Sequence, residues 1–90
     1  MTAEFIWDTV TSAMIEEFEL EPGQMVPEAK IKDDLGLDSL DVVDMVIVLE
    51  TAFDFRIQDK SALKEIVTLA DVADFIAATI EAEKGKVANG

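Results

Sequence analysis

Apolar residues recur three and four positions apart in three stretches of this 90-residue chain, at 3–19, 39–54 and 69–83. This spacing places side chains on one face of a helix. The first stretch repeats the residues Ile6, Val10, Ala13, Met14 and Phe18. The last repeats the residues Leu69, Val72, Phe75, Ile76 and Ile80. The pattern therefore predicts three main helices whose apolar faces share one core, with Phe5 and Trp7 partly buried beside the first stripe.

The segments between these stretches carry turn signals. Residues 20–37 contain Pro22-Gly23, Pro27 and Gly36, which predict a long connection. Its packing residues are expected to be Met25, Val26, Ile31, Leu35 and Leu37. Residues 55–68 predict a linker with one short helix capped by Asp59, and Thr68 and Asp71 fit a capping box for the last helix. The expected fold class is all-α: a small bundle of three main helices and one short helix over residues 1–84, with a flexible tail at 85–90.

The stretch 39–54 is apolar on two faces. The stripe assigned to the core consists of Val42, Val46, Leu49 and Phe53. The second stripe is Leu40, Val43 and Ile47, with Asp41 and Asp44 beside it. A helix apolar on two faces is either buried all round or presents one stripe to a partner. Because a small domain can hardly bury both faces, we expect Leu40 and Ile47 to form an apolar patch rimmed by carboxylates, while core burial stays open for Val43.

The start of this helix places one serine in a definite setting. Asp38 is the expected N-cap, and Asp41 stands three residues later at the capping-box position. Ser39 is then the first helical residue, at the positive end of the helix dipole. The dipole and the free N–H groups would favour a phosphate ester there. The neighbouring carboxylates disfavour capture of a free anion, so the sequence indicates a phosphate attached covalently by another enzyme.

Charge narrows the possible partners. The net charge is −13, and residues 33–55 hold seven acidic residues and no Lys or Arg. Such a surface repels nucleic acid and favours basic partner proteins through long-range steering. The chain shows neither an apolar run long enough to span a membrane nor a signal-peptide pattern, so a cytoplasmic location is expected.

The residue types also limit the chemistry. The chain has no His and no Cys, so Ser39 has no histidine base nearby and catalysis by this chain is disfavoured. The alternative is that Ser39 serves only to begin the helix. For a lone serine near a helix start, without a wider motif around it, this alternative would be favoured. The acidic cluster around Asp33 and Asp34 lacks the spacing of an EF-hand, so no defined metal site is expected.

A longer pattern surrounds Ser39. Asp38-Ser39-Leu40 is preceded by Asp34-Leu35-Gly36 and followed by Asp41-x-Val43-Asp44 and by Leu49-Glu50-x-x-Phe53. This run resembles the acyl carrier proteins, and a looser match extends over about residues 5–80. The resemblance implies the same helical fold, with 4′-phosphopantetheine attached covalently to Ser39 from coenzyme A and acyl groups held on its thiol as thioesters. The implied protein is a carrier in fatty-acid, polyketide or related lipid biosynthesis and not an enzyme.

The resemblance also implies partners. These are a phosphopantetheinyl transferase (holo-ACP synthase), ketosynthases, acyltransferases and other acyl-processing enzymes, which dock basic surfaces on a monomeric carrier. The expected contact residues are Asp38, Leu40, Asp41, Val43, Asp44 and Ile47. Two alternatives stay open: an aminoacyl or peptidyl carrier, and a carrier-like structural subunit that binds basic partners.

The chain departs from the common fatty-acid carriers in the region expected to face partners. Thr51 and Ala52 stand where those carriers tend to have Glu, and Arg56 where a small or acidic residue is common. Lys60 and Lys64 fall in a short helix that is usually acidic in the family. These departures indicate a carrier for a specialised pathway, with a housekeeping fatty-acid carrier as the alternative.

Overall fold

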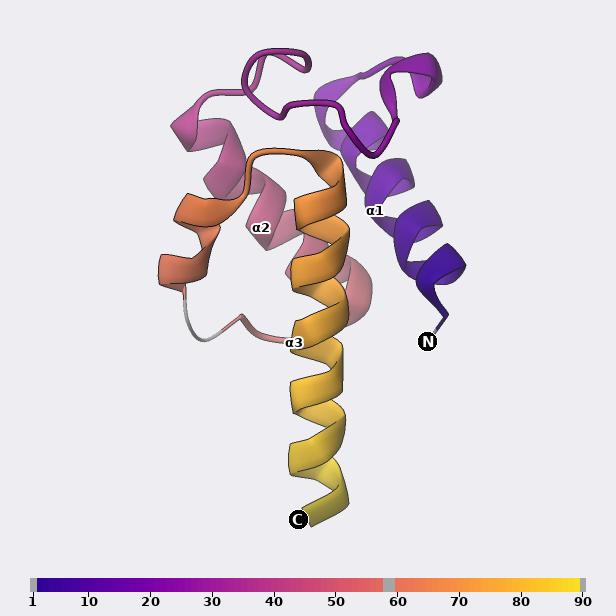
Figure 1. The fold of residues 1–90 in the computed structure, drawn as a ribbon, viewed down its shortest axis with the longest axis vertical. Coiled ribbons are helices and arrows are strands. Elements are labelled where there is room, and N and C mark those ends of the chain that lie inside the picture. The colour runs from indigo at the N-terminus through magenta and orange to yellow at the C-terminus, as the bar shows by residue number, and fades with distance from the viewer. Residues whose placement is uncertain (1, 58–59, 90) are drawn as a thin grey trace.

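The chain folds as a bundle of helices around one core (Figure 1). The structure is a computed structural model that describes the backbone of residues 2–57 and 60–89 and the side chains of residues 2–57 and 63–82. Within this part, the α-helices are α1 (Ala3–Phe18), α2 (Ser39–Phe53) and α3 (Leu69–Asn89), and the short 3-10 helices are η1 (Pro22–Gln24) and η2 (Lys60–Glu65). α1 contacts both α2 and α3. The all-α bundle that the sequence predicts is confirmed, while the predicted Asp59 cap lies outside the described residues.

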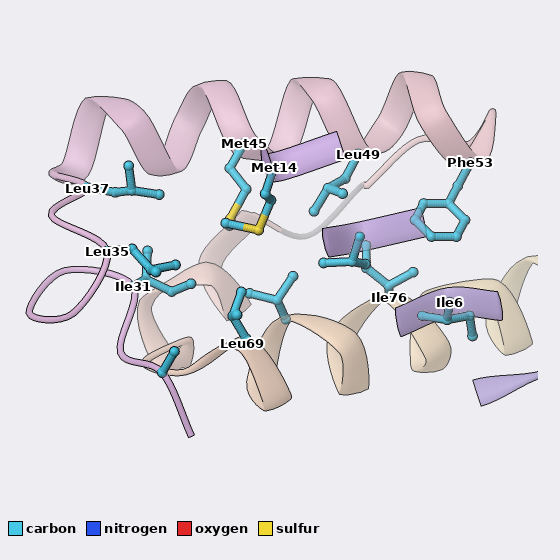
Figure 2. Close-up of a cluster of buried hydrophobic side chains, with 13 residues drawn as sticks. Ile6, Met14, Ile31, Leu35, Leu37, Met45, Leu49, Phe53, Leu69 and Ile76 are labelled. Carbon is cyan, nitrogen blue, oxygen red and sulfur yellow. The ribbon is translucent and has the colours of Figure 1, made fainter. Parts of the chain in front are cut away.

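The core forms where the helices face one another (Figure 2). Ile6, Val10 and Met14 of α1 are buried, as the sequence pattern predicts. Met14 and Met45 point toward one another from α1 and α2. Among the described side chains of α3, Leu69, Val72 and Ile76 are buried. Burying these side chains removes most of the apolar surface of the three stripes from water, which is the main stabilising contribution to such a domain.

The inward face of α2 differs from the predicted one by a small rotation. Met45 is only 1% exposed, although the sequence analysis did not assign it to the core, and Val42 is half-buried. Met45, Leu49 and Phe53 form one row with four-residue spacing, which directs them together into the bundle.

Two burial predictions outside α2 are wrong: Phe5 and Val26 are 51% and 40% exposed.

The long connection is packed against the bundle and bonded to the start of α3. Ile31, Leu35 and Leu37 are buried and close one end of the core (Figure 2). The N–H groups of Leu69 and Ala70 donate to the carbonyl oxygens of Ala29 and Pro27, at 3.0 and 2.8 Å. The first N–H groups of a helix lack partners within the helix. Here the connection supplies these partners, and this fixes the segment that leads to α2.

A capping box starts α3, as predicted. The N–H of Asp71 donates to Thr68 Oγ1 at 3.2 Å, and Asp71 Oδ2 accepts from the N–H groups of Val67 and Thr68 at 2.9 and 3.0 Å. The bonds from the Val67 and Thr68 N–H groups, with a smaller effect of the Thr68 hydroxyl, lower the pKa of Asp71 against the opposing effect of desolvation.

α3 is longer than predicted. It continues to Asn89, six residues past the predicted end at 83, and its last turns extend below the other helices (Figure 1). Glu81 to Lys84 are good helix formers, and one glycine at position 85 lowers helix propensity without removing a backbone hydrogen-bond donor. The predicted flexibility of residues 85–90 stays a prediction.

Candidate functional site

Ser39 is the first residue of α2, in the position that the sequence predicts. The N–H of Asp41 donates to Asp38 Oδ1 at 3.0 Å, and the N–H of Asp38 donates to Asp41 Oδ2 at 3.1 Å. Asp38 has an extended backbone, with φ −95° and ψ −172°, as an N-cap requires. This reciprocal capping box fixes the point at which the helix begins, and therefore the place of Ser39.

The Ser39 hydroxyl is open to solvent. Ser39 is exposed, and its side chain makes no hydrogen bond with the described part of the chain. The backbone N–H groups of Ser39 and Leu40 likewise have no partner among the described residues, whereas the connection occupies those of Leu69 and Ala70 in α3. An ester on Ser39 thus needs no rearrangement of the protein, and two N–H donors lie beside it at the positive end of the helix.

A tight turn leads into the site. The N–H of Leu37 donates to the carbonyl oxygen of Ile31 at 3.1 Å, and the N–H of Gly36 donates to the carbonyl oxygen of Lys32 at 3.2 Å. Gly36 has φ +73°, a left-handed conformation that side chains with a Cβ rarely adopt. Leu35 and Leu37, on either side of Gly36, point into the core and hold the turn (Figure 2).

The second apolar stripe of α2 faces solvent. Leu40 is 77% exposed, Val43 54% and Ile47 55%, which decides the open question about Val43 in favour of the surface. Asp44 is exposed beside them and Asp41 is half-buried. The capping box uses one oxygen each of Asp38 and Asp41, and the other oxygens remain for a partner. Of the six predicted contact residues, Asp38 is thus the N-cap of α2, and the other five lie on this helix between Leu40 and Ile47.

Glu50 has a structural role that the sequence did not reveal. Its Oε2 accepts from the N–H of Ile57 at 2.7 Å, and Ile57 is buried. This bond ties the segment after α2 back onto the helix.

Neither a metal site nor a membrane helix is found in the part of the chain that the structure describes. Over this part, no three carboxylates are grouped so that they could hold a metal ion. Among the same residues, none of the helices combines the length and apolarity needed to cross a membrane.

Comparisons with known proteins give the family. Residues 8–76 match the family model described as phosphopantetheine attachment site. The acyl carrier protein of Prochlorococcus marinus (strain MIT 9515) is 40% identical over 85 residues, which cover 94% of this chain and 100% of that protein. The acyl carrier protein of Campylobacter curvus (strain 525.92) is 39% identical over 71 residues, covering 79% of this chain and 91% of the relative.

The fold agrees with these matches. A solved Mycobacterium tuberculosis chain described as an acyl carrier protein superposes with a TM-score of 0.73 at 25% identity, over 81% of this chain and 96% of that chain. The chain belongs to the acyl carrier protein family. It is a carrier protein and not a catalyst, and its prosthetic group is a covalently attached phosphopantetheine.

Proposed function

We propose that Ser39 is the attachment residue and that the chain delivers acyl groups between enzymes of fatty-acid, polyketide or related lipid biosynthesis in the cytoplasm. The observation that supports this most is the exposed Ser39 hydroxyl at the start of a capped helix, within the matched residues 8–76. When bound, the prosthetic group supplies a thiol that holds the acyl group as a thioester.

The residues around Ser39 suit attachment by another enzyme. The capping box keeps Ser39 on the first turn, and solvent exposure gives a transferase access to its hydroxyl. The free N–H groups of Ser39 and Leu40 and the helix dipole stabilise the negative charge of a phosphodiester at this position. With no His in the chain, deprotonation of the hydroxyl falls to the transferase.

The surface beside Ser39 suits transient docking. Leu40, Val43 and Ile47 offer a small apolar contact, and Asp38, Asp41 and Asp44 surround it with negative charge. Charge of one sign speeds the encounter with a basic partner, and a small interface allows fast release. Both properties are needed by a carrier that serves a transferase, ketosynthases and acyltransferases in turn. These partners, and docking as a monomer, are part of the proposal.

The test is delivery of a labelled acyl group. A broad-specificity transferase charges the chain from labelled acyl-coenzyme A, and the product is offered to an acyltransferase with a basic docking surface. We expect label that neutral hydroxylamine releases, as for a thioester, and transfer that slows when Ile47→Ala or Asp44→Asn is used. Charging of Ser39→Ala to the same extent as the parent would refute Ser39 as the site. Normal charging without transfer to any such enzyme would favour a structural subunit.

A further inference from the structure

Three lysines line one hollow on an otherwise acidic protein. The hollow is lined by Lys30, Lys32, Asp33, Lys64, Ile66 and Val67 and has a volume of about 220 Å³. Of the seven basic residues in the chain, four have described side chains, and three of these four line this hollow. We call it the lysine hollow. Neither the carrier role nor the docking surface on α2 uses it.

The charges of the lysine hollow are not neutralised within the described structure. Lys30, Lys32 and Lys64 form no ion pair with the described residues. The Asp34 carboxylate is nearby, since its Oδ2 accepts from the backbone N–H of Lys30 at 2.8 Å, but Asp34 does not line the hollow and forms no ion pair with these lysines. Asp33 is the one carboxylate among the lining residues, so three positive charges face one negative charge. Like charges gathered in a concave site attract anions more strongly than the same charges spread over a convex surface.

The lysine hollow is tied to the turn that carries Ser39. The N–H of Ile31, which lies between Lys30 and Lys32, donates to the Val67 carbonyl at 2.8 Å. The Ile31 carbonyl accepts from the N–H of Leu37 at 3.1 Å, and Leu37 is two residues before Ser39. The path from Lys32 to Ser39 consists of one residue step to Ile31, the hydrogen bond between Ile31 and Leu37, and two further residue steps. With about 3.8 Å between successive Cα atoms, the Cα atoms of Lys32 and Ser39 are therefore at most about 20 Å apart. A long flexible group on Ser39 has only this distance to span.

We propose that the lysine hollow binds the terminal carboxylate of an acyl group attached at Ser39, so that the chain carries a dicarboxylic type of cargo. This inference rests on the proposed attachment at Ser39. The lysines would pair with the carboxylate, and Ile66 and Val67 would contact the methylene groups behind it. The tether makes the binding intramolecular and raises the effective concentration of the carboxylate. Exposed charge pairs, which are weak individually, are then sufficient.

The experiment compares two cargoes of equal length. A broad-specificity transferase loads the chain from succinyl-coenzyme A or from butyryl-coenzyme A, so that the acyl-phosphopantetheine is esterified to Ser39 and the adenosine bisphosphate leaves, and intact mass verifies each product. The two acyl groups have four carbons each and differ in the terminal carboxylate. Backbone amide shifts are then compared between the two products. We expect the succinyl product to differ from the butyryl product at Lys32, Ile66 and Val67, and this difference to decrease at high salt.

Matched variants test the charges. We expect Lys32→Gln and Lys64→Gln each to reduce the bound population about two- to fivefold, as for an exposed charge pair. Arg56→Gln removes a positive charge outside the lysine hollow and is expected to leave the difference unchanged. Asp33→Asn removes the competing carboxylate and is expected to increase the bound population.

The outcomes separate the two proposals. Equal amide shifts for both cargoes, or a difference that survives both lysine variants, would overturn the lysine hollow as a cargo site while leaving Ser39 as the attachment residue. Lysine variants that slow transfer to a partner enzyme without changing these shifts would likewise overturn it, in favour of an acidic protein surface as occupant. Failure of Ser39 to accept either group would overturn both proposals.

Discussion

Asp71 gives the capping box of α3 a definite pH dependence. Its Oδ2 accepts from two backbone N–H groups, at 2.9 and 3.0 Å, and these bonds lower its pKa below the ordinary value of 3.8. Asp71→Asn removes the charge but keeps the size of the side chain. A hydrogen bond to a charged group contributes about 1.5–3 kcal/mol when it is well shielded. Because Asp71 is only partly buried, we expect a loss of about 1–2 kcal/mol for both bonds together.

The sign of the pH effect follows from the lowered pKa. Asp71 stabilises the folded state at pH values above its ordinary pKa, where the carboxylate is charged in both states. This contribution is lost as the pH falls below 3.8 and through the lower pKa of the folded state. The difference in unfolding free energy between the parent and Asp71→Asn is therefore expected to be largest near neutral pH and to shrink in acid.

Thermal and urea unfolding followed by circular dichroism at neutral pH and in acid measure this difference. A loss of 1 kcal/mol corresponds to a decrease in Tm of about 4–8 °C for a domain of this size. Asp74→Asn is the matched control, since Asp74 is exposed one turn later in α3 and no hydrogen bond of its side chain is found among the described residues. An equal loss of stability in both variants at neutral pH, or a loss from Asp71→Asn that does not change with pH, would refute the reasoning.

Three further predictions concern the turn, the core and the docking surface. Gly36→Ala is expected to destabilise the fold by about 1–2 kcal/mol in urea unfolding, because φ is +73°, although no heavy atom beyond the adjoining residues lies within 4 Å of the added Cβ; unchanged stability would contradict this. Met45→Ala is expected to cost about 2–5 kcal/mol as a cavity in the core, and a surface-like loss under 0.5 kcal/mol would contradict its burial. Ile47→Ala and Asp44→Asn are expected to change Tm little while weakening binding of a basic partner in calorimetric titration, the second less so at high salt. Full affinity in both variants would exclude this face as the docking surface.

Much of the fold could be predicted because local signals agreed with one another. Asp38 with Asp41, and Thr68 with Asp71, mark helix starts through side chains that bond to backbone groups three residues away. Such bonds depend little on the rest of the fold. The apolar periodicity of α1 and α3 likewise gave the inward faces, since both helices have one apolar stripe.

The rest depended on how the elements pack. α2 has apolar residues on two faces, so its spacing alone could not distinguish Met45 from Val42 as the inward residue. Only the position of α1, with Met14 opposite Met45, decides this (Figure 2). The bond from the Ile57 N–H to Glu50 joins residues seven apart across the end of a helix, and no local pattern indicates it.

The lysine hollow could likewise not be predicted from the sequence, because it depends on how two segments pack. Lys64 is more than thirty residues away from Lys30 and Lys32 in the sequence, so the sequence alone does not indicate that the three lysines lie together. The bond between the Ile31 N–H and the Val67 carbonyl brings the two segments together. The attachment residue, by contrast, lies within one continuous motif at the start of α2, so it could be proposed from the sequence.

The measurement that tests the central claim most directly is the intact mass of the apo chain after incubation with coenzyme A and a broad-specificity phosphopantetheinyl transferase. Ser39→Ala tests the site, and Ser12→Ala, at an exposed serine of α1, is the matched control. We predict a gain of one phosphopantetheine on the parent and on Ser12→Ala and none on Ser39→Ala. A modified Ser39→Ala chain, or a folded parent that gains no mass, would contradict the assignment of Ser39.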